Sequence, residues 1–228
     1  MARRNTGLLL FIDEPPSVAS RWPDAELSAS AVAAVVDAVH RDLLANLSST
    51  EGVTIYLAPT EAGASRYVDR LAQETGTTVC QVPGTGPMQR WEASLSILYN
   101  ERGHRKILCV AGGIPDLYPE DLARIRRKLD LYPLVVGREG EDRCWLLGMN
   151  GYHDVLHSAQ VRPDDLLHPI LKAASGRGLE VSVVDTKHAI HASSGVRRLR
   201  LLASRPQHPR LKKALAASGL SPLPRPSP

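Results

Sequence analysis

The chain has 228 residues, 43% of them hydrophobic, and a formal net charge of +4 at pH 7. This length and hydrophobic content fit one α/β domain with a complete core. There is a single phenylalanine, and aromatic residues do not alternate with basic ones, which argues against nucleic acid as a partner. The apolar run 8–12 is too short for a signal peptide, and no run approaches a membrane span, so we expect a cytoplasmic protein without a membrane partner.

The hydrophobic pattern predicts strands and helices in alternation along the chain. Strands are expected at 7–12, 53–57, 77–81, 107–111, 134–137, 144–149 and 179–184. Helices are expected from Ser28 or Ser30 to about 47, and at 61–75, 88–101, 119–129, 164–175 and 196–203. The prolines of 13–17 predict a loop. Repeated β-α units indicate a mostly parallel sheet flanked by helices.

The composition changes after Ala203 to proline, arginine and serine. We therefore predict an α/β domain over 1–203 and a basic, Pro-rich tail over 204–228, with a short helix at about 211–217 and a frayed end. The three cysteines fall inside predicted strands without metal-ligand spacing. We expect them to be buried free thiols.

Polar residues and glycines follow two of the predicted strands directly. The first strand runs into Asp13 and Glu14, and the strand 107–111 ends in Gly112-Gly113-Ile114-Pro115-Asp116. In open α/β sheets, ligands bind outside the carboxyl ends of the strands. The sequence therefore predicts a ligand site between the segments 13–21 and 112–116.

Three segments together resemble a known family. They are Phe11-Ile-Asp-Glu-Pro-Pro, which leads to Arg21 and the Ala-rich helix, Ala111 to Leu117, and Gly137 to Gly148. The chain up to about Ala203 is similar to bacterial glycosyltransferase-like proteins of the nucleotide-diphospho-sugar transferase (GT-A) fold. The resemblance implies a single-domain GT-A-like fold and a nucleotide-sugar donor. It places donor contacts at Phe11, Asp13, Glu14, Arg21, Gly112, Gly113, Arg143 and Trp145, with Trp145 as an aromatic platform.

The sequence departs from the family pattern at positions that matter for chemistry. The family's metal-binding aspartate falls on Gly113, which has no side chain to ligate a metal. The family's Asp-Gly-Gly-Tyr segment is Glu141-Asp142-Arg143-Cys144 here, and the basic cluster after the first strand is reduced to Arg21. The resemblance thus implies the fold more firmly than the activity.

Two ways of neutralising a leaving nucleoside diphosphate remain open. A divalent Mn²⁺ or Mg²⁺ could be held by Asp116, Asp185 and His188, although Gly113 disfavours a metal. The metal-free alternative uses arginine and lysine side chains, namely Arg21, Arg138, Arg143 and Lys187. Asp116 has a structural alternative as the cap of the helix that starts near Pro119, and His188 as an ordinary loop residue.

Acidic residues between the strands 134–137 and 144–149 are candidates for contact with the acceptor, the molecule that would receive the sugar. Glu141 and Asp142 are predicted to orient or deprotonate an acceptor hydroxyl, whereas plain surface charge is the alternative. Asp116, which follows the strand 107–111, is the third candidate catalytic residue. The leading hypothesis is sugar transfer from a nucleotide-activated donor to a small-molecule or peptide acceptor. A non-catalytic homologue that binds a ligand or a partner is the second hypothesis, and a nucleotidyltransferase is the third.

Overall fold

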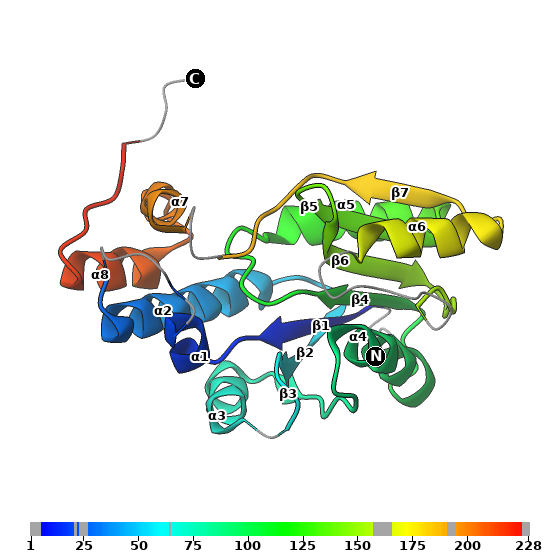
Figure 1. Cartoon of the computed structure of the whole chain (residues 1–228), viewed down its shortest axis with the longest axis horizontal. Helices are drawn as coiled ribbons and strands as arrows, with labels where there is room; N and C mark the ends of the chain where they lie inside the picture. Colours follow the sequence, from blue (N-terminus) through cyan, green and yellow to red (C-terminus); the bar gives the residue numbers. More distant parts are fainter. Residues whose placement is uncertain are drawn as a thin grey trace.

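The computed structural model of the protein describes residues 6–20, 22, 27–63, 65–156, 166–190 and 195–224. These residues form a seven-stranded sheet with the strand order β3-β2-β1-β4-β6-β5-β7 (Figure 1). The strands are β1 Thr6–Ile12, β2 Val53–Pro59, β3 Thr78–Val79, β4 Lys106–Val110, β5 Leu134–Glu139, β6 Arg143–Asn150 and β7 Val181–Val184. Only β6 runs antiparallel to its neighbours, β4 and β5. The prediction of an α/β fold with a mostly parallel sheet is confirmed.

Helices connect and flank these strands. They are α1 Pro15–Ser20, α2 Ala29–Leu47, α3 Arg66–Thr75, α4 Pro87–Ser96 with the π-helical turn η1 Ile97–Glu101, α5 Pro119–Leu131, α6 Leu167–Gly176, α7 Gly195–Leu202 and α8 Pro209–Ala217. The prediction of a loop at 13–17 is wrong, because α1 begins at Pro15. Proline is tolerated in the first turn of a helix, where its missing N–H would have no partner.

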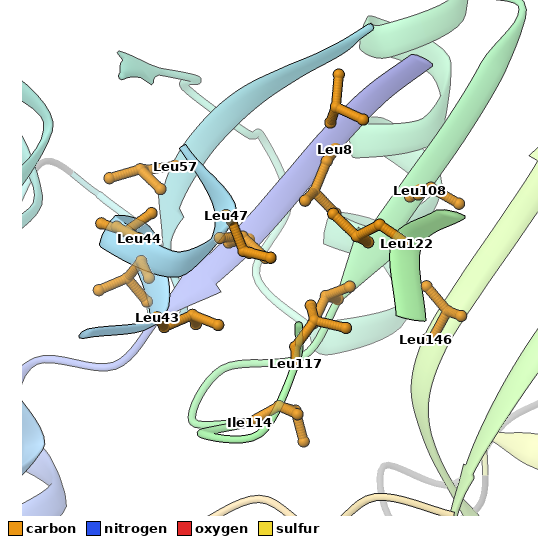
Figure 2. Packing of buried hydrophobic residues seen from close by; sticks show 14 of the residues in the cluster. Leu8, Leu43, Leu44, Leu47, Leu57, Leu108, Ile114, Leu117, Leu122 and Leu146 are labelled. Atoms are coloured by element: carbon orange, nitrogen blue, oxygen red, sulfur yellow. The ribbon is translucent and has the colours of Figure 1, made fainter. Parts of the chain in front are cut away.

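The core lies on both faces of the sheet because side chains alternate along each strand. Leu8 and Leu10 of β1 pack on one face with leucines of α2 and α5, as the close view in Figure 2 shows for Leu8, Leu47 and Leu122. Leu9 and Phe11 of the same strand pack on the other face with α4 and α6. β1 is buried along its whole length. The three cysteines are buried free thiols, as predicted.

The helices α7 and α8 pack beside α2 (Figure 1). Leu211 and Leu215 of α8 are fully buried in a cluster that includes Val35 and Val39 of α2. The buried carboxylate of Asp42 in α2 accepts hydrogen bonds from the backbone N–H groups of Leu211 at 2.9 Å and Arg210 at 3.3 Å. These donors at the start of a helix have no partner within it, so Asp42 satisfies them from outside. The short helix predicted after Ala203 is therefore held against the domain.

None of the helices in the described ranges is long and apolar enough to cross a membrane.

Candidate functional site

A cavity of about 610 Å³ lies at the carboxyl ends of β1 and β4. Its wall includes residues from α1, α4, the β5–β6 hairpin and the segment that follows β7. The residues that matter most for its chemistry are Phe11, Asp13, Arg90, Trp91, Gly112, Glu139, Arg143 and Ala189. The volume is within the range of roughly 300–1,000 Å³ that is usual for small-molecule sites.

Gly112 allows the two strand ends to approach each other closely. A Cβ atom at this position would lie 2.5 Å from Oδ2 of Asp13 and 2.9 Å from the carbonyl oxygen of Phe11. Gly113, the next residue, has a φ of 73°, which is in the left-handed region that glycine adopts without strain. Its carbonyl oxygen accepts the N–H of Ile190 at 2.8 Å. This bond holds the segment after β7 at the carboxyl end of β4, where Ala189 and Ile190 line the cavity.

Phe11, Trp91 and Arg90 form one wall of the cavity. The rings of Phe11 and Trp91 are stacked, with centroids 6.3 Å apart. Arg90 is buried, and its guanidinium donates to the carbonyl of Val82 at 2.7 Å and to that of Pro59. Burial lowers the pKa of Arg90. Because Nη1 and Nη2 each donate to a backbone carbonyl, Arg90 holds the loops around the cavity together.

Glu139 is the buried acid of the cavity, and the sequence pattern did not single it out. Its side chain is 6% exposed, Oε1 accepts the N–H of Ala189 at 2.8 Å, and Nη2 of Arg143 lies 4.0 Å away. The sequence suggested that β5 ends at Gly137. The strand instead continues past a register shift between Gly137 and Arg138, and Glu139 pairs with Arg143. Strand alternation indicates only that Arg138 and Glu139 face opposite sides, so no local signal marks Glu139 as a site residue.

The structure brings together half of the predicted donor contacts. Phe11, Asp13, Gly112 and Arg143 line the cavity, whereas Glu14, Gly113 and Trp145 do not. Arg21, the remaining predicted contact, lies outside the described residues.

Trp145 has no ring face exposed to a ligand. It is only 1% exposed, its Nε1–H donates to the carbonyl of Asp185 at 3.2 Å, and its ring fills the space beside Gly137, where a Cβ would lie 2.4 Å from it. The predicted stacking platform is therefore part of the core. The aromatic residues that line the cavity are Phe11, Trp22 and Trp91.

The predicted metal ligands are not assembled around a common point. Asp116 pairs with Arg198, at 2.8 Å between Oδ2 and Nη2, and Asp185 pairs with Arg124. His188 is exposed. Asp116 does not cap α5 either, because the N-cap residue is Tyr118, whose N–H donates to Asp121 at 3.1 Å.

Glu141 and Asp142 lie at the tip of the β5–β6 hairpin, and both are exposed. Neither lines the cavity. Oδ1 of Asp142 is 3.6 Å from Nδ1 of His168, and the Asp142 carbonyl accepts the N–H of Leu167 at the start of α6. In this structure the two acids predicted for acceptor chemistry are thus exposed and lie outside the lining of the cavity.

The residues described here do not fit a carboxylate-bound metal. Over the ranges that the structure covers, no group of three or more histidine, cysteine, aspartate or glutamate side chains is placed to hold one ion. Position 113, where the resemblance puts the metal aspartate, is a glycine.

The chain matches no family model and no curated protein. Among solved structures it is similar to a protein from Desulfovibrio desulfuricans G20 named as a nucleotide-diphospho-sugar transferase, with a TM-score of 0.77 and 15% identity over 94% of this chain and 97% of that one. It is also similar to a cytidylyltransferase from Leptospira borgpetersenii, with a TM-score of 0.57 and 10% identity over 94% and 95%.

A third similar structure is the glucosyl-3-phosphoglycerate synthase of Mycobacterium tuberculosis, solved with Mn²⁺, UDP and glucosyl-3-phosphoglycerate. Its TM-score is 0.56, and the 10% identity covers 96% of this chain and 81% of that one. These likenesses show the fold. The chain has the nucleotide-diphospho-sugar transferase fold, of the GT-A-like type, which the sequence resemblance implied.

Proposed function

We propose that this protein binds a nucleotide-activated sugar in the cavity at the ends of β1 and β4 and transfers the sugar to an acceptor. The observation that carries the proposal is the place of the cavity. Asp13 and Gly112, which follow adjacent parallel strands, both line it. Open α/β sheets bind ligands at this edge, and the fold is shared with transferases that use nucleotides.

The lining residues suit the parts of such a donor. Gly112 has no side chain at the cavity wall, so a ligand can approach the backbone there. The Arg143 guanidinium is 51% exposed and available to a phosphate. Phe11 and Trp91 supply an apolar wall. Stabilising the leaving nucleoside diphosphate and deprotonating the acceptor hydroxyl are the two tasks of sugar transfer. Arg143 supports the first, and the carboxylates of Asp13 and Glu139 support the second.

Nucleotidyl transfer is the second candidate, because a cytidylyltransferase has a TM-score close to that of the glucosyl transferase. A nucleoside triphosphate carries more negative charge and needs basic residues after the first strand. That segment, 13–21, contains Asp13 and Glu14, and Arg21 is its single basic residue. This composition favours a nucleotide sugar over a triphosphate. A non-catalytic binding protein would keep the cavity and lack turnover.

The test is a binding screen followed by product analysis. Calorimetry with UDP, GDP, CDP, ADP and their sugar conjugates, with and without Mn²⁺ or Mg²⁺, identifies a nucleotide. Arg143→Ala is expected to weaken its binding by roughly tenfold, since a hydrogen bond to a charged group is lost. Arg127→Ala, on the exposed side of α5, is the matched control.

Product analysis then separates the hypotheses. Release of a nucleoside diphosphate supports sugar transfer, and release of pyrophosphate supports nucleotidyl transfer. Binding without turnover of any acceptor supports the non-catalytic hypothesis. The absence of binding for every nucleotide in the screen would overturn the proposed function.

A further inference from the structure

We propose that a basic surface on α7 and α8 binds the anionic headgroups of a lipid membrane. The basic surface consists of the exposed cations of these two helices and of the turn between them, namely Arg197, Arg205, Arg210, Lys212 and Lys213. We expected no membrane partner because no apolar run could span a bilayer. An attraction between charges requires no such run. This contact is independent of the nucleotide binding proposed above.

Charge is distributed unevenly along the chain. The segment 195–228 holds eight of the 28 lysine and arginine residues and none of the 24 aspartate and glutamate residues. Its formal charge is therefore +8, which leaves −4 for residues 1–194 and gives the net +4 of the whole chain. A block of one charge at the end of a chain is typical of a segment that contacts a polyanion or an anionic surface.

The packing of α7 and α8 fixes these charges on the folded domain. One buried cluster joins apolar residues of α2, α7 and α8, namely Val35, Val39, Leu199, Leu202, Leu211 and Leu215. Leu211 and Leu215 are four residues apart and so occupy one face of α8, while Lys212 and Lys213 are exposed. The three helices lie together at one end of the molecule (Figure 1). The cations are therefore carried by helices that belong to the domain.

Three cations of the basic surface form no ion pair with any residue that the structure describes. They are Arg197, Lys212 and Lys213, and all three are exposed. Arg210 lies 3.3 Å from Asp42, but its side chain is 53% exposed. Each lysine or arginine held near an anionic membrane surface strengthens binding by roughly fivefold. Three or four such cations together strengthen it by about 10²- to 10³-fold.

The residues between the cations favour a membrane over a nucleic acid. The segment 195–228 contains no aromatic residue, so bases would find no ring on which to stack. It contains partly exposed leucines instead, at Leu201, Leu220 and Leu223. Leucines that occur among lysines and arginines suit the boundary between headgroups and acyl chains, where apolar and charged groups are both accommodated.

The basic surface also adjoins the cavity. Trp22 and Ile190 line the cavity and pack against the same buried cluster that holds α7 and α8 to α2. The helices that carry the cations thus support one wall of the cavity from behind. Roughly one helix diameter, about 10 Å, separates the two sides of such a helix. Binding of a membrane there would therefore bring the cavity close to the lipid surface.

The experiment measures binding of the full chain to lipid vesicles by co-sedimentation. The probes are vesicles of phosphatidylcholine alone and vesicles that contain about 30% anionic phosphatidylglycerol, with double-stranded DNA as a third probe. The wild type is expected to bind the anionic vesicles more tightly than the neutral ones by about tenfold or more. Binding is expected to weaken as NaCl rises from about 0.05 to about 0.3 M, because salt screens exposed charges.

Two double variants locate the contact. Lys212→Gln with Lys213→Gln removes two charges from the basic surface and is expected to lower affinity for the anionic vesicles by about tenfold or more. Arg105→Gln with Arg127→Gln removes two exposed charges outside α7 and α8 and is the matched control, with an expected loss of less than about twofold. Both pairs lower the net charge equally, so a difference between them depends on position. An unchanged melting temperature reports that each variant is folded.

Three outcomes overturn the inference. The first is equal binding of the wild type to neutral and anionic vesicles, because the basic surface would then be solvated charge. The second is an equal loss of affinity in the two double variants, because net charge rather than this surface would then drive binding. The third is unchanged vesicle binding by the lysine variant together with weakened binding of DNA, since the partner would then be a nucleic acid. None of these outcomes decides the nucleotide screen, so this inference and the proposed function fail separately.

Discussion

Asp116 and Arg198 form an ion pair, with Oδ2 and Nη2 2.8 Å apart, between the β4–α5 loop and α7, which are 82 residues apart in sequence. Both side chains are mostly buried, at 20% and 25% exposure. The backbone carbonyl of Asp116 also accepts a hydrogen bond from Lys187. These contacts join three segments near the cavity, and from them we predict a structural role for Asp116.

If that role is correct, Asp116→Asn lowers stability. The expected loss is about 1–3 kcal/mol in the free energy of unfolding, because a charged hydrogen bond in a partly buried place is weakened. Arg198→Ala should show a similar loss, and the double variant should reveal a coupling of roughly 0.5–3 kcal/mol. Urea denaturation measures all three. Unchanged stability together with lost transfer would return Asp116 to the catalytic residues.

The packing of α8 against α2 predicts different effects for two neighbouring residues. Leu211 is fully buried and Lys212 is exposed. Leu211→Ala is expected to cost about 2–5 kcal/mol, because it leaves a cavity in the core. Lys212→Ala, the matched control, should stay within about 0.5 kcal/mol of the wild type. Equal stabilities for both variants in chemical denaturation would mean that α8 does not contribute to the folded domain.

His40 makes stability dependent on pH. It is buried in α2 with Nδ1 2.9 Å from the hydroxyl of Tyr67, and burial lowers its pKa to about 4, although the charge of Asp37 opposes the shift. The ordinary pKa of histidine is about 6.5. Between these values the unfolded chain is protonated at His40 and the folded protein is neutral, so stability falls as the pH drops from about 6.5 towards about 4.

The expected size of this effect is on the order of a few kcal/mol. It is measured as the free energy of unfolding of the wild type minus that of His40→Gln, at several pH values from 7.5 to about 4. Taking this difference cancels the pH dependence that other groups, such as the carboxylates and His208, contribute to the stability of both proteins. A difference that does not vary with pH would show that His40 has the same pKa in the folded and the unfolded protein, and would contradict this prediction.

Gly112 and Gly176 provide a test of the close approach at the cavity. A methyl group at Gly112 would collide with Asp13 and with the carbonyl of Phe11, whereas one at Gly176 would meet nothing within 4 Å. Gly112→Ala is expected to destabilise the protein by roughly 1–3 kcal/mol, since a strand end must move. Gly176→Ala should be neutral or slightly stabilising within the helix. Thermal melting of the two variants checks this, and equal melting temperatures would contradict it.

Much of the fold could be predicted from local pattern. The apolar runs at 7–12 and 107–111 indicated buried strands, and the structure has β1 and β4 there. The pattern left Ser28 or Ser30 as the start of the following helix, and the structure has Ser28 as the N-cap of α2. These features depend on neighbours in sequence, through side-chain alternation and capping bonds. The same reasoning missed α1, since prolines 15 and 16 are compatible with either a loop or a first helical turn.

The site was less predictable, because its residues meet through contacts between distant segments. The sequence by itself determined the class of fold and the edge of the sheet where Phe11, Asp13 and Gly112 border the cavity, since the positions of the strand ends follow from the hydrophobic pattern and glycine placement. Only the tertiary structure decided which acids face that cavity. Glu139 is turned inward beyond a shift in strand register and held by Ala189, 50 residues away, while Glu141 and Asp142 are left at the exposed hairpin tip. The residues around a carboxylate in the sequence do not show its role. That role depends on burial and on partners that the side chain acquires only when the chain folds.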